Sequence, residues 1–288
     1  MTELRKKINN LVEDYNACKV LAESVENPNV YEGTTATSSD IVFGKTAYSN
    51  GKLIEGELLA GNTIVSTTWT AGTTVSPIVQ SLKRIDGKIV VSGTSVQSFF
   101  RDCNNLEAAP DMDTSNVTNM NFVCMGCHSI TSVPKWNTSK VTEWNYAFSS
   151  CKLLKSIPDF DTSATTTFSN MFTSCTSLET APAFDTKNGK VFSAMFQNCT
   201  SLKNVPQYNF SGIVWRQTNA LQDMFKGCTS LSDDALNNIM ASLMTANALE
   251  SFANRSLSYV GLTQAQAERC MTLPKWAEFS AAGLITGY

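Results

Sequence analysis

A fixed period constrains this chain more than any other feature of its sequence. Six cysteines define the period, the first five spaced by 24 residues and the last by 29: Cys103, Cys127, Cys151, Cys175, Cys199 and Cys228. A period in the twenties is typical of solenoids, in which each copy buries its apolar side chains only against neighbouring copies. The sequence therefore predicts a repeat solenoid over residues 96–231, with six copies built from short parallel strands and irregular or helical turns.

Other columns of residues keep the same register as the cysteines. Three residues before each cysteine stand Phe100, Cys124, Phe148, Phe172, Phe196 and Phe225. Three residues after it stand Leu106, Ile130, Leu154, Leu178, Leu202 and Leu231, and five copies then carry Pro110, Pro134, Pro158, Pro182 and Pro206. We expect a short strand at each Leu-x-x-(Val/Ile/Ala)-Pro stretch, a turn around each cysteine, and a rung spacing of about 4.8 Å.

These columns resemble a known repeat. The pattern M-F-x-x-C-x-S-L-x-x-x-P-x-x-D-T-S-x-V-T, clearest from Met171 to Thr186, resembles the BspA-like leucine-rich repeat in the form common in mycoplasma surface lipoproteins. The resemblance implies a leucine-rich-repeat fold for the middle of the chain. It says little about the ligand.

Residues 1–27 read as a helix with a heptad seam. Its apolar positions alternate by four and three at Leu4, Ile8, Leu11, Tyr15, Cys18, Ala22 and Val25. This spacing is typical of a coiled coil, so the segment is predicted to be an oligomerisation helix. A coiled coil of three heptads is only marginally stable by itself, so other parts of the chain are expected to support the association. Analogy with fibre proteins favours a homotrimer. The alternative is an amphipathic helix that lies on its own domain.

Residues 28–60 are predicted to be a linker and a small β-hairpin, with Asn50-Gly51 as the tight turn. The stretch from Asp40 to Gly56, D-I-V-F-G-K-T-A-Y-S-N-G-K-L-I-E-G, resembles an element of tail, fibre and other minor virion proteins of phages of Gram-positive hosts. This resemblance implies a context rather than a reaction. It implies that the N-terminal region attaches the chain to other virion proteins.

Residues 61–95 are rich in Val, Ile and Thr and are predicted to form a β cap on the solenoid. The expected strands are Thr63–Trp69, Thr74–Leu82 and Lys88–Ser92, and Asp86-Gly87 is expected to be a second hairpin turn.

Residues 232–288 break the period and are predicted to be a helical C-terminal cap. A helix from Asp233 to Ala246 has Leu236, Ile239, Met240 and Leu243 on one face and Ser232 or Asp233 as its N-cap. A second helix opens at Thr263 and stops before Pro274. The end of the chain resembles the tails of phage-encoded proteins of this repeat type.

One motif suggests a cofactor. Cys124 to His128 reads C-M-G-C-H, the form of a haem attachment site or, through C-x-x-C, of a redox site. The period explains it instead, because Cys127 is the column cysteine and Cys124 occupies a phenylalanine position. We expect buried free thiols rather than disulfides, and neither a cofactor nor a metal site.

Catalytic patterns are also weak. The pairs Asp111/Asp113 and Asp159/Asp161 are better explained as turn residues whose carboxylates accept backbone N–H groups. Gly44-Lys45-Thr46 lacks the first glycine of a phosphate-binding loop, and the chain has a single histidine. We therefore expect no enzyme, although a glycan-degrading enzyme of the cell wall or capsule, built on scattered carboxylates, stays open.

A ligand surface is the remaining possibility. The outward positions of the expected strands and two tryptophans form the candidate set: Glu107, Thr131, Trp136, Lys155, Glu179, Lys203 and Trp215. The charged positions are explained equally well by a face that is exposed to solvent and binds no ligand. Trp144 is expected in the core, because its column contains Met120, Phe168 and Phe192.

Composition narrows the partners. The net charge is −3, the basic residues are scattered, and no apolar run is long enough for a bilayer, so neither nucleic acid nor membrane insertion is expected. The basic residues of Met1 to Lys7 are followed by no apolar stretch, so an ordinary secretory signal is not expected here. Together with the resemblance of Asp40 to Gly56 to minor virion proteins, these features favour a phage virion protein (a fibre, tail tip or head fibre), made in the host cytoplasm, whose repeats meet a glycan or protein of the host surface. The alternative is a bacterial cell-surface adhesin of the BspA-like type.

Overall fold

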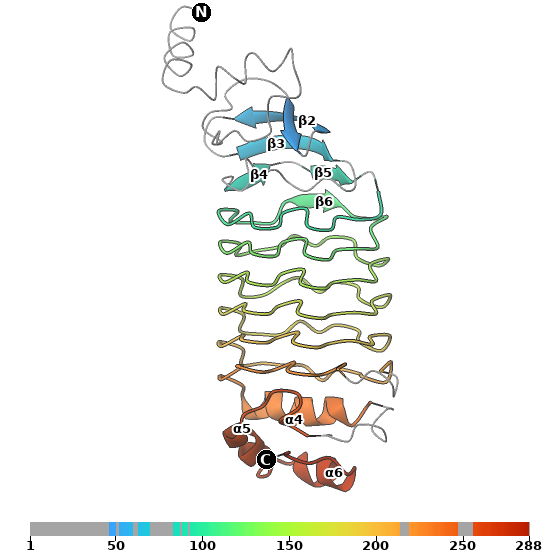
Figure 1. The fold of residues 1–288 in the computed structure, drawn as a ribbon, viewed down its shortest axis with the longest axis vertical. Coiled ribbons are helices and arrows are strands. Elements are labelled where there is room, and N and C mark those ends of the chain that lie inside the picture. The colour runs from blue at the N-terminus through green and yellow to red at the C-terminus, as the bar shows by residue number, and fades with distance from the viewer. Residues whose placement is uncertain are drawn as a thin grey trace, which may run out of the picture.

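A stack of parallel coils forms most of the part of the chain that the structure describes. The computed structural model describes residues 46–49, 52–59, 63–69, 83–86, 88–91, 93–213, 219–246 and 256–287. Figure 1 shows the coils lying one above another between a small sheet and a group of helices. The heptad residues of the predicted coiled coil, the predicted strand Thr74–Leu82 and Trp215 lie outside the described residues.

Hydrogen bonds between consecutive coils fix the stack. Each coil pairs with the next at the same position of the repeat, through the parallel bridges Ser95↔Asn119, Asn119↔Glu143, Glu143↔Thr167 and Thr167↔Val191. Threonine hydroxyls add a second ladder, in which Thr118, Thr142 and Thr166 each donate to the backbone carbonyl of the threonine 24 residues earlier. Equivalent residues of successive copies are therefore neighbours in space, which is the arrangement that a repeat solenoid requires.

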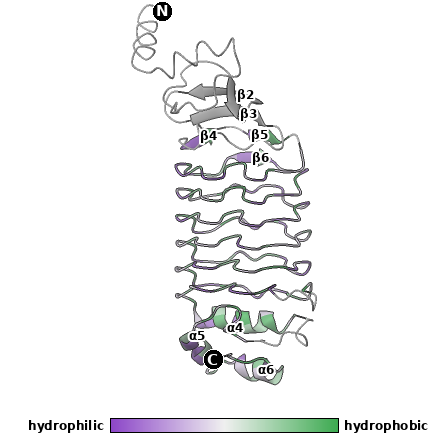
Figure 2. Cartoon of the chain, in the orientation of Figure 1, coloured by the Kyte–Doolittle hydropathy of each residue, from purple (hydrophilic) through white to green (hydrophobic). Residues whose placement is uncertain are grey.

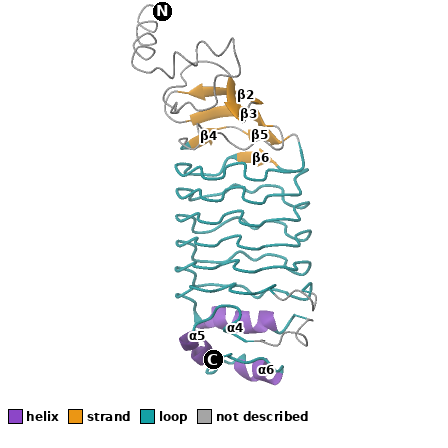
Figure 3. Ribbon diagram, in the orientation of Figure 1, coloured by secondary structure: helices purple, strands orange, loops and turns teal. Residues whose placement is uncertain are grey.

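The coils contain less regular strand than the sequence suggested. The described coils hold one strand, β6 (Asp111–Asp113), and the rest is loop and turn in Figure 3. At the expected strands the structure has isolated bridges, Ala108↔Ser132 and Thr180↔Asn204. Each coil also has two residues with positive φ, in the columns that begin at Ser98 and Asp102. Residues in this conformation cannot belong to a regular strand, although the backbone around them still pairs with the next coil, as the Phe100 N–H does with the Val123 carbonyl.

A sheet lies at the N-terminal end of the stack. Strands β1 (Thr46–Ser49) and β2 (Lys52–Leu59) pair antiparallel, with Ser49 opposite Lys52, as expected for the predicted hairpin. The predicted turn residues Asn50-Gly51 lie outside the described residues. Strand β2 pairs antiparallel with β3 (Thr63–Trp69). The sheet order is β1-β2-β3-β5-β6, so the sheet continues directly into the first coil.

The predicted hairpin turn at Asp86-Gly87 is wrong. Strands β4 (Arg84–Asp86) and β5 (Lys88–Val91) both pair in parallel with β3 rather than with each other. Strand β5 also pairs in parallel with β6, with Lys88 opposite Asp111. Strands β4 and β5 therefore run in the same direction, whereas the two strands of a hairpin run in opposite directions.

Helices close the other end of the stack. Helix α4 (Asp233–Leu243) begins at the N-cap Ser232, whose side chain accepts from the Ala235 N–H. Its predicted apolar face is confirmed, since Leu236, Ile239, Met240 and Leu243 are buried. Helix α5 (Gln264–Cys270) has the capping box Thr263/Gln266.

Polar side chains of this end take the place of a further coil. Asn238 Nδ2 donates to the Val205 carbonyl at 2.9 Å, and Ser242 Oγ accepts from the Tyr208 N–H at 2.8 Å. Thr245 Oγ1 accepts from the Phe210 N–H at 2.7 Å. The backbone groups that the last coils would otherwise leave unpaired are thus satisfied by α4 and the turn after it.

A third helix, α6 (Trp276–Ala281), was not predicted. It has six residues, its start lacks a side-chain cap, and Phe279 is its one buried residue. One buried contact in six residues leaves no helical period to detect.

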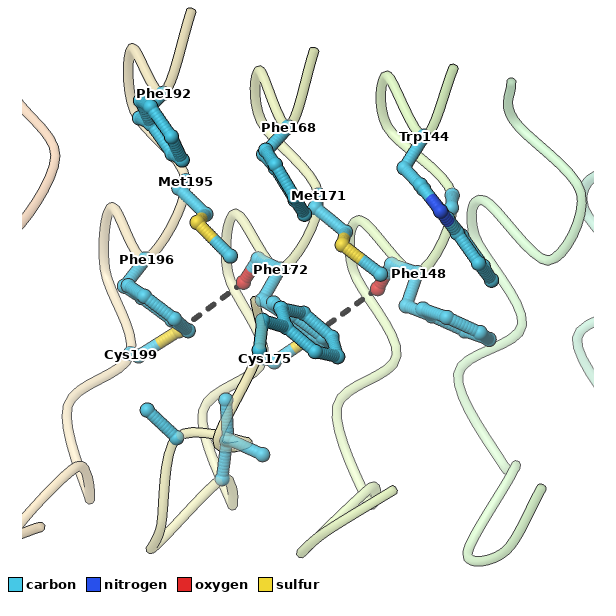
Figure 4. Close-up of a cluster of buried hydrophobic side chains, with 14 of the residues drawn as sticks. Trp144, Phe148, Phe168, Met171, Phe172, Cys175, Phe192, Met195, Phe196 and Cys199 are labelled. Carbon is cyan, nitrogen blue, oxygen red and sulfur yellow. Dashed lines mark hydrogen bonds between the residues drawn. The ribbon is translucent and has the colours of Figure 1, made fainter. Parts of the chain in front are cut away.

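The interior of the stack consists of side-chain ladders. Phe148, Phe172, Phe196 and Phe225 stack with ring centroids 5.6–5.8 Å apart and planes within 12° of parallel. Figure 4 shows Phe168 and Phe192 in a second such ladder, with Met171 and Met195 between the two. Offset stacking of this kind adds to the hydrophobic gain of burial. In Figure 2 green apolar residues accordingly recur in coil after coil.

Two tryptophans in this core differ in one hydrogen bond. Trp136 Nε1 donates to the Pro110 carbonyl at 3.0 Å, whereas Trp144 Nε1 is buried with no partner among the described residues. Trp144 lies in the core, as predicted, beside Phe148 and Phe160.

Because of this difference, replacing each tryptophan by phenylalanine should lower the free energy of unfolding by unequal amounts. Trp136→Phe should lower the free energy of unfolding by about 1–3 kcal/mol more than Trp144→Phe, because only the first leaves a buried carbonyl without its donor. Both changes remove a similar volume, so the cavity cost is matched. Urea unfolding followed by circular dichroism measures the two values, and equal costs would contradict the explanation.

Candidate functional site

The recurring cysteine is a hydrogen-bonding residue of the interior. Five of the six thiols donate to a carbonyl of the preceding coil. Cys127, Cys151 and Cys175 donate to Phe100, Cys124 and Phe148, each 27 positions earlier, at 2.9–3.2 Å. Cys199 donates to Phe172, also 27 positions earlier, and Cys228 donates to Phe196, 32 positions earlier, because the last spacing is five residues longer. A small apolar side chain with a weak donor therefore suits this position.

The thiols are free and buried, as the sequence predicted. Burial raises the pKa of Cys175 and Cys228 to about 12 and that of Cys270 to about 11. A thiol held in its neutral form is a poor nucleophile and a poor metal ligand. The column therefore belongs to the packing of the stack.

The Asp and Asn column forms turns, also as predicted. Asp113, Asp161 and Asp185 each accept from the backbone N–H two residues later at 3.0–3.2 Å, and Asn137 and Asn209 do the same. Hydrogen bonds from Ser163 lower the pKa of Asp161. The following threonine links the coils, since Thr162 Oγ1 donates to the Asp185 carbonyl at 2.9 Å. Both members of the D-T pair thus have structural partners.

The predicted charged ladder lies on the surface. Glu107, Thr131, Lys155, Glu179 and Lys203 are all exposed. Their backbones are linked, with the Thr131 N–H donating to Glu107 at 2.9 Å and the Lys203 N–H donating to Glu179 at 2.9 Å. The charges alternate along the column, and the binding role of this ladder stays a prediction.

Trp136 is not part of that surface. The expectation of an exposed tryptophan is wrong, because Trp136 is 3% exposed and stacks on Phe148 and Phe160. The sequence contained the signal: 24-residue steps from Trp136 reach Phe160, Phe184 and Tyr208, an entirely aromatic column. The other tryptophan of the candidate surface, Trp215, lies outside the described residues.

Sequence reasoning missed a cluster of amide and carboxylate groups on the second and third coils. Glu143 Oε2 accepts from Asn119 Nδ2 at 3.1 Å and from Asn121 Nδ2 at 2.6 Å. Asn121 Oδ1 accepts from the Asn145 N–H at 2.7 Å, and Asn145 Oδ1 accepts from Thr167 Oγ1 at 2.6 Å. We call Asn119, Asn121, Glu143, Asn145 and Thr167 the amide cluster.

An aromatic pair adjoins the amide cluster. Phe122 and Tyr146 stack with ring centroids 5.2 Å apart, and the Arg101 guanidinium lies 5.8 Å from the centre of the Phe122 ring. Both aromatic residues are only partly buried and have positive φ, 59° and 56°. Bulky side chains rarely adopt this conformation. Departure from the repeat in these two copies is the signal that would have found the site.

Comparison with known proteins identifies the repeats. Residues 94–207 and 127–239 match the model of a family described as "Mycoplasma protein of unknown function, DUF285". The two matches overlap and together span half of the chain. The chain belongs to this family. Its BspA-like character is thereby shown, while comparison with the curated proteins and with the solved structures finds no significant match.

Among the described residues, no three His, Cys, Asp or Glu side chains lie close enough together to hold a metal ion. The helices of the described part are all too short or too polar to span a bilayer.

The buried thiols of the DUF285 repeats predict a stability loss at high pH. An unfolded thiol titrates near 9 and the folded Cys175 near 12, so its stabilising contribution is complete below pH 9 and is lost as the pH rises toward 12. Each such thiol contributes a slope of up to about 1.4 kcal/mol per pH unit in that window. Urea midpoints at pH 8 and pH 10.5 measure the fall.

A double variant identifies the groups responsible. Cys175→Ala/Cys199→Ala should be less stable than the parent at pH 8 but should lose less between pH 8 and pH 10.5. Gln207→Ala, at an exposed position, is the matched control and should keep the parental slope. An unchanged slope in the double variant would exclude these thiols as the cause.

Proposed function

We propose that this chain is a virion structural protein, a fibre, tail tip or head fibre, that presents a BspA-like leucine-rich-repeat solenoid to a host surface. The observation that carries the proposal is the stack itself. Its interior is filled by ladders of Phe, Met and Cys, while its outside repeats polar columns such as Glu107 to Lys203. A rigid face built from repeated positions is a recognition surface in many solenoids.

The virion context rests on sequence. The element from Asp40 to Gly56 resembles part of minor virion proteins, and the end of the chain resembles phage-encoded proteins of this repeat type. The N-terminal heptads would assemble the chain into a trimer and join it to other virion proteins. Host ligands of both classes, glycan and protein, fit such a face.

A second candidate is a cell-surface adhesin. The family match favours it, because the family is described from mycoplasma proteins and the repeat resembles that of mycoplasma surface lipoproteins. Antibody against the chain separates the two candidates. It labels particles induced from a strain that carries the gene if the chain is a virion protein, and it labels intact cells if the chain is an adhesin.

Binding to an envelope tests the recognition role. The full-length protein should sediment with envelopes of its host when it is mixed with a panel of Gram-positive bacteria, and it should release no soluble fragments. Release of reducing sugar or peptide would instead favour the enzyme alternative. Failure to sediment with any envelope in the panel would contradict the proposal.

Disrupting the heptad seam tests the assembly. The parent should sediment as a trimer of about 94 kDa, three times the 31.4 kDa chain. Leu4→Asp/Leu11→Asp should sediment as a monomer, because charges at two core positions of a short coiled coil are not tolerated. Glu13→Gln, which changes the same predicted helix outside the seam, should remain trimeric. A monomeric parent at micromolar concentration would contradict the trimer.

A further inference from the structure

The second and third coils depart from the repeat at neighbouring positions. The column of Phe122 and Tyr146 holds Ser98, Asn170, Ala194 and Asp223 in the other coils, so an aromatic ring stands there only in these two coils. The column of Glu143 holds Ser95, Asn119, Thr167, Val191 and Ala220 elsewhere, so Glu143 is its one carboxylate. The stack therefore forms without a ring or a carboxylate at these columns. Packing between coils does not explain the departure.

Backbone conformation makes the departure costly. Phe122 and Tyr146 occupy the left-handed region, where the same column elsewhere holds Ser98, Asn170 and Ala194. Asparagine adopts this conformation more readily than a bulky residue does. Strained residues that persist at an exposed position suggest a function rather than a structural need.

The cluster also leaves specific polar groups unused. Both amide donors reach the same oxygen of Glu143, so Oε1 has no partner among the described residues. Asn145 uses its Oδ1 for Thr167, and its Nδ2 donates to no group in the described part of the chain. The Tyr146 ring, next in sequence, is partly exposed. One acceptor, one donor and one ring surface thus lie within four residues, at partly exposed positions on either side of the buried Trp144, with the Glu143 carboxylate bonded to the coil before and the Asn145 amide to the coil after.

We propose that Glu143, Asn145 and Tyr146 bind the acetamido group of an N-acetylated hexosamine in a surface glycan. This inference rests on the proposed function and names its ligand class. An acetamido group has one N–H, one carbonyl and one methyl. The N–H donates to Glu143 Oε1, the carbonyl accepts from Asn145 Nδ2, and the methyl packs on the Tyr146 ring.

Charge favours this ligand over anionic ones. The Glu143 carboxylate repels phosphate and uronate groups. The nearby Arg101 is paired with Asp102, Nε to Oδ2 at 3.4 Å. The amide cluster is held in place by its own hydrogen bonds, so little side-chain freedom is lost on binding. A single small contact of this kind binds weakly, with a Kd of about 1 mM, and several copies in an oligomer raise the avidity.

The test uses two trisaccharides and the full-length protein. Tri-N-acetylchitotriose carries acetamido groups, and cellotriose has the same linkage without them. Saturation-transfer NMR should show transfer to the acetyl methyl groups of the first and none to the second. Glu143→Gln should raise the Kd at least tenfold, because an amide N–H₂ replaces the acceptor.

Two further variants complete the design. Tyr146→Asn introduces the residue that Asn170 places at this position one coil later, so the coil should fold while the Kd rises at least fivefold. Glu179→Gln makes the same chemical change as Glu143→Gln on the exposed charged ladder and should bind like the parent. Loss of binding in Glu179→Gln with none in Glu143→Gln would move the site to that ladder and overturn the inference.

The remaining outcomes separate the two proposals. Equal binding of cellotriose, or no binding of tri-N-acetylchitotriose by the parent, overturns the glycan site. If the parent still sediments with host envelopes in that case, the recognition role stands and only this site fails. If the trisaccharide binds but no envelope does, the glycan site stands and the proposed function fails.

Discussion

The hydrogen bond between equivalent positions of adjacent coils is the interaction on which the structure depends. Hydrogen bonds within a coil, such as that from the Cys127 N–H to the Cys124 carbonyl, satisfy only part of its backbone. The remaining backbone groups must be paired by the coil before it and the coil after it. The period follows from this requirement, because the groups that pair must recur at the same place in every coil. The longer last spacing keeps that register, since Cys228 still donates to the Phe196 carbonyl. The threonine hydroxyls and cysteine thiols serve the same end, since each is a side chain that donates to the coil before or after its own.

The two ends of the stack solve the same problem in different ways. At the N-terminal end, β5 continues the backbone pairing as a parallel strand. At the other end, the backbone groups of helix α4 are already hydrogen-bonded within the helix and cannot pair with the last coil. The side chains of Asn238 and Ser242 make these hydrogen bonds to the backbone of the last coil instead. Both ends leave the core ladders covered, which a stack with open ends would expose to water.

Periodic residues were the ones that the sequence could predict. The buried cysteines, the turns at Asp113 and Asp161, the core position of Trp144 and the apolar face of α4 all follow from recurring patterns. Local signals were less reliable. Asp86-Gly87 suggested a hairpin, but the strands on either side of it both pair in parallel with β3, and this pairing overrode the turn preference. Trp136 was judged as a single residue instead of a member of its column. The amide cluster was missed because its contacts join residues 22–24 positions apart, and only the stacked geometry brings them together.

The side chains of α4 that close the last coil also restrict how the chain can change in length. Asn238, Ser242 and Thr245 are matched to the backbone of residues 205–210, so this final unit and its helix must be inherited together. Duplication or loss of a unit in the interior alters neither end, because each new copy presents the same groups as the one it follows. Related chains are therefore expected to differ in the length of their solenoid by whole repeats, while the sheet at one end and the helices at the other stay the same.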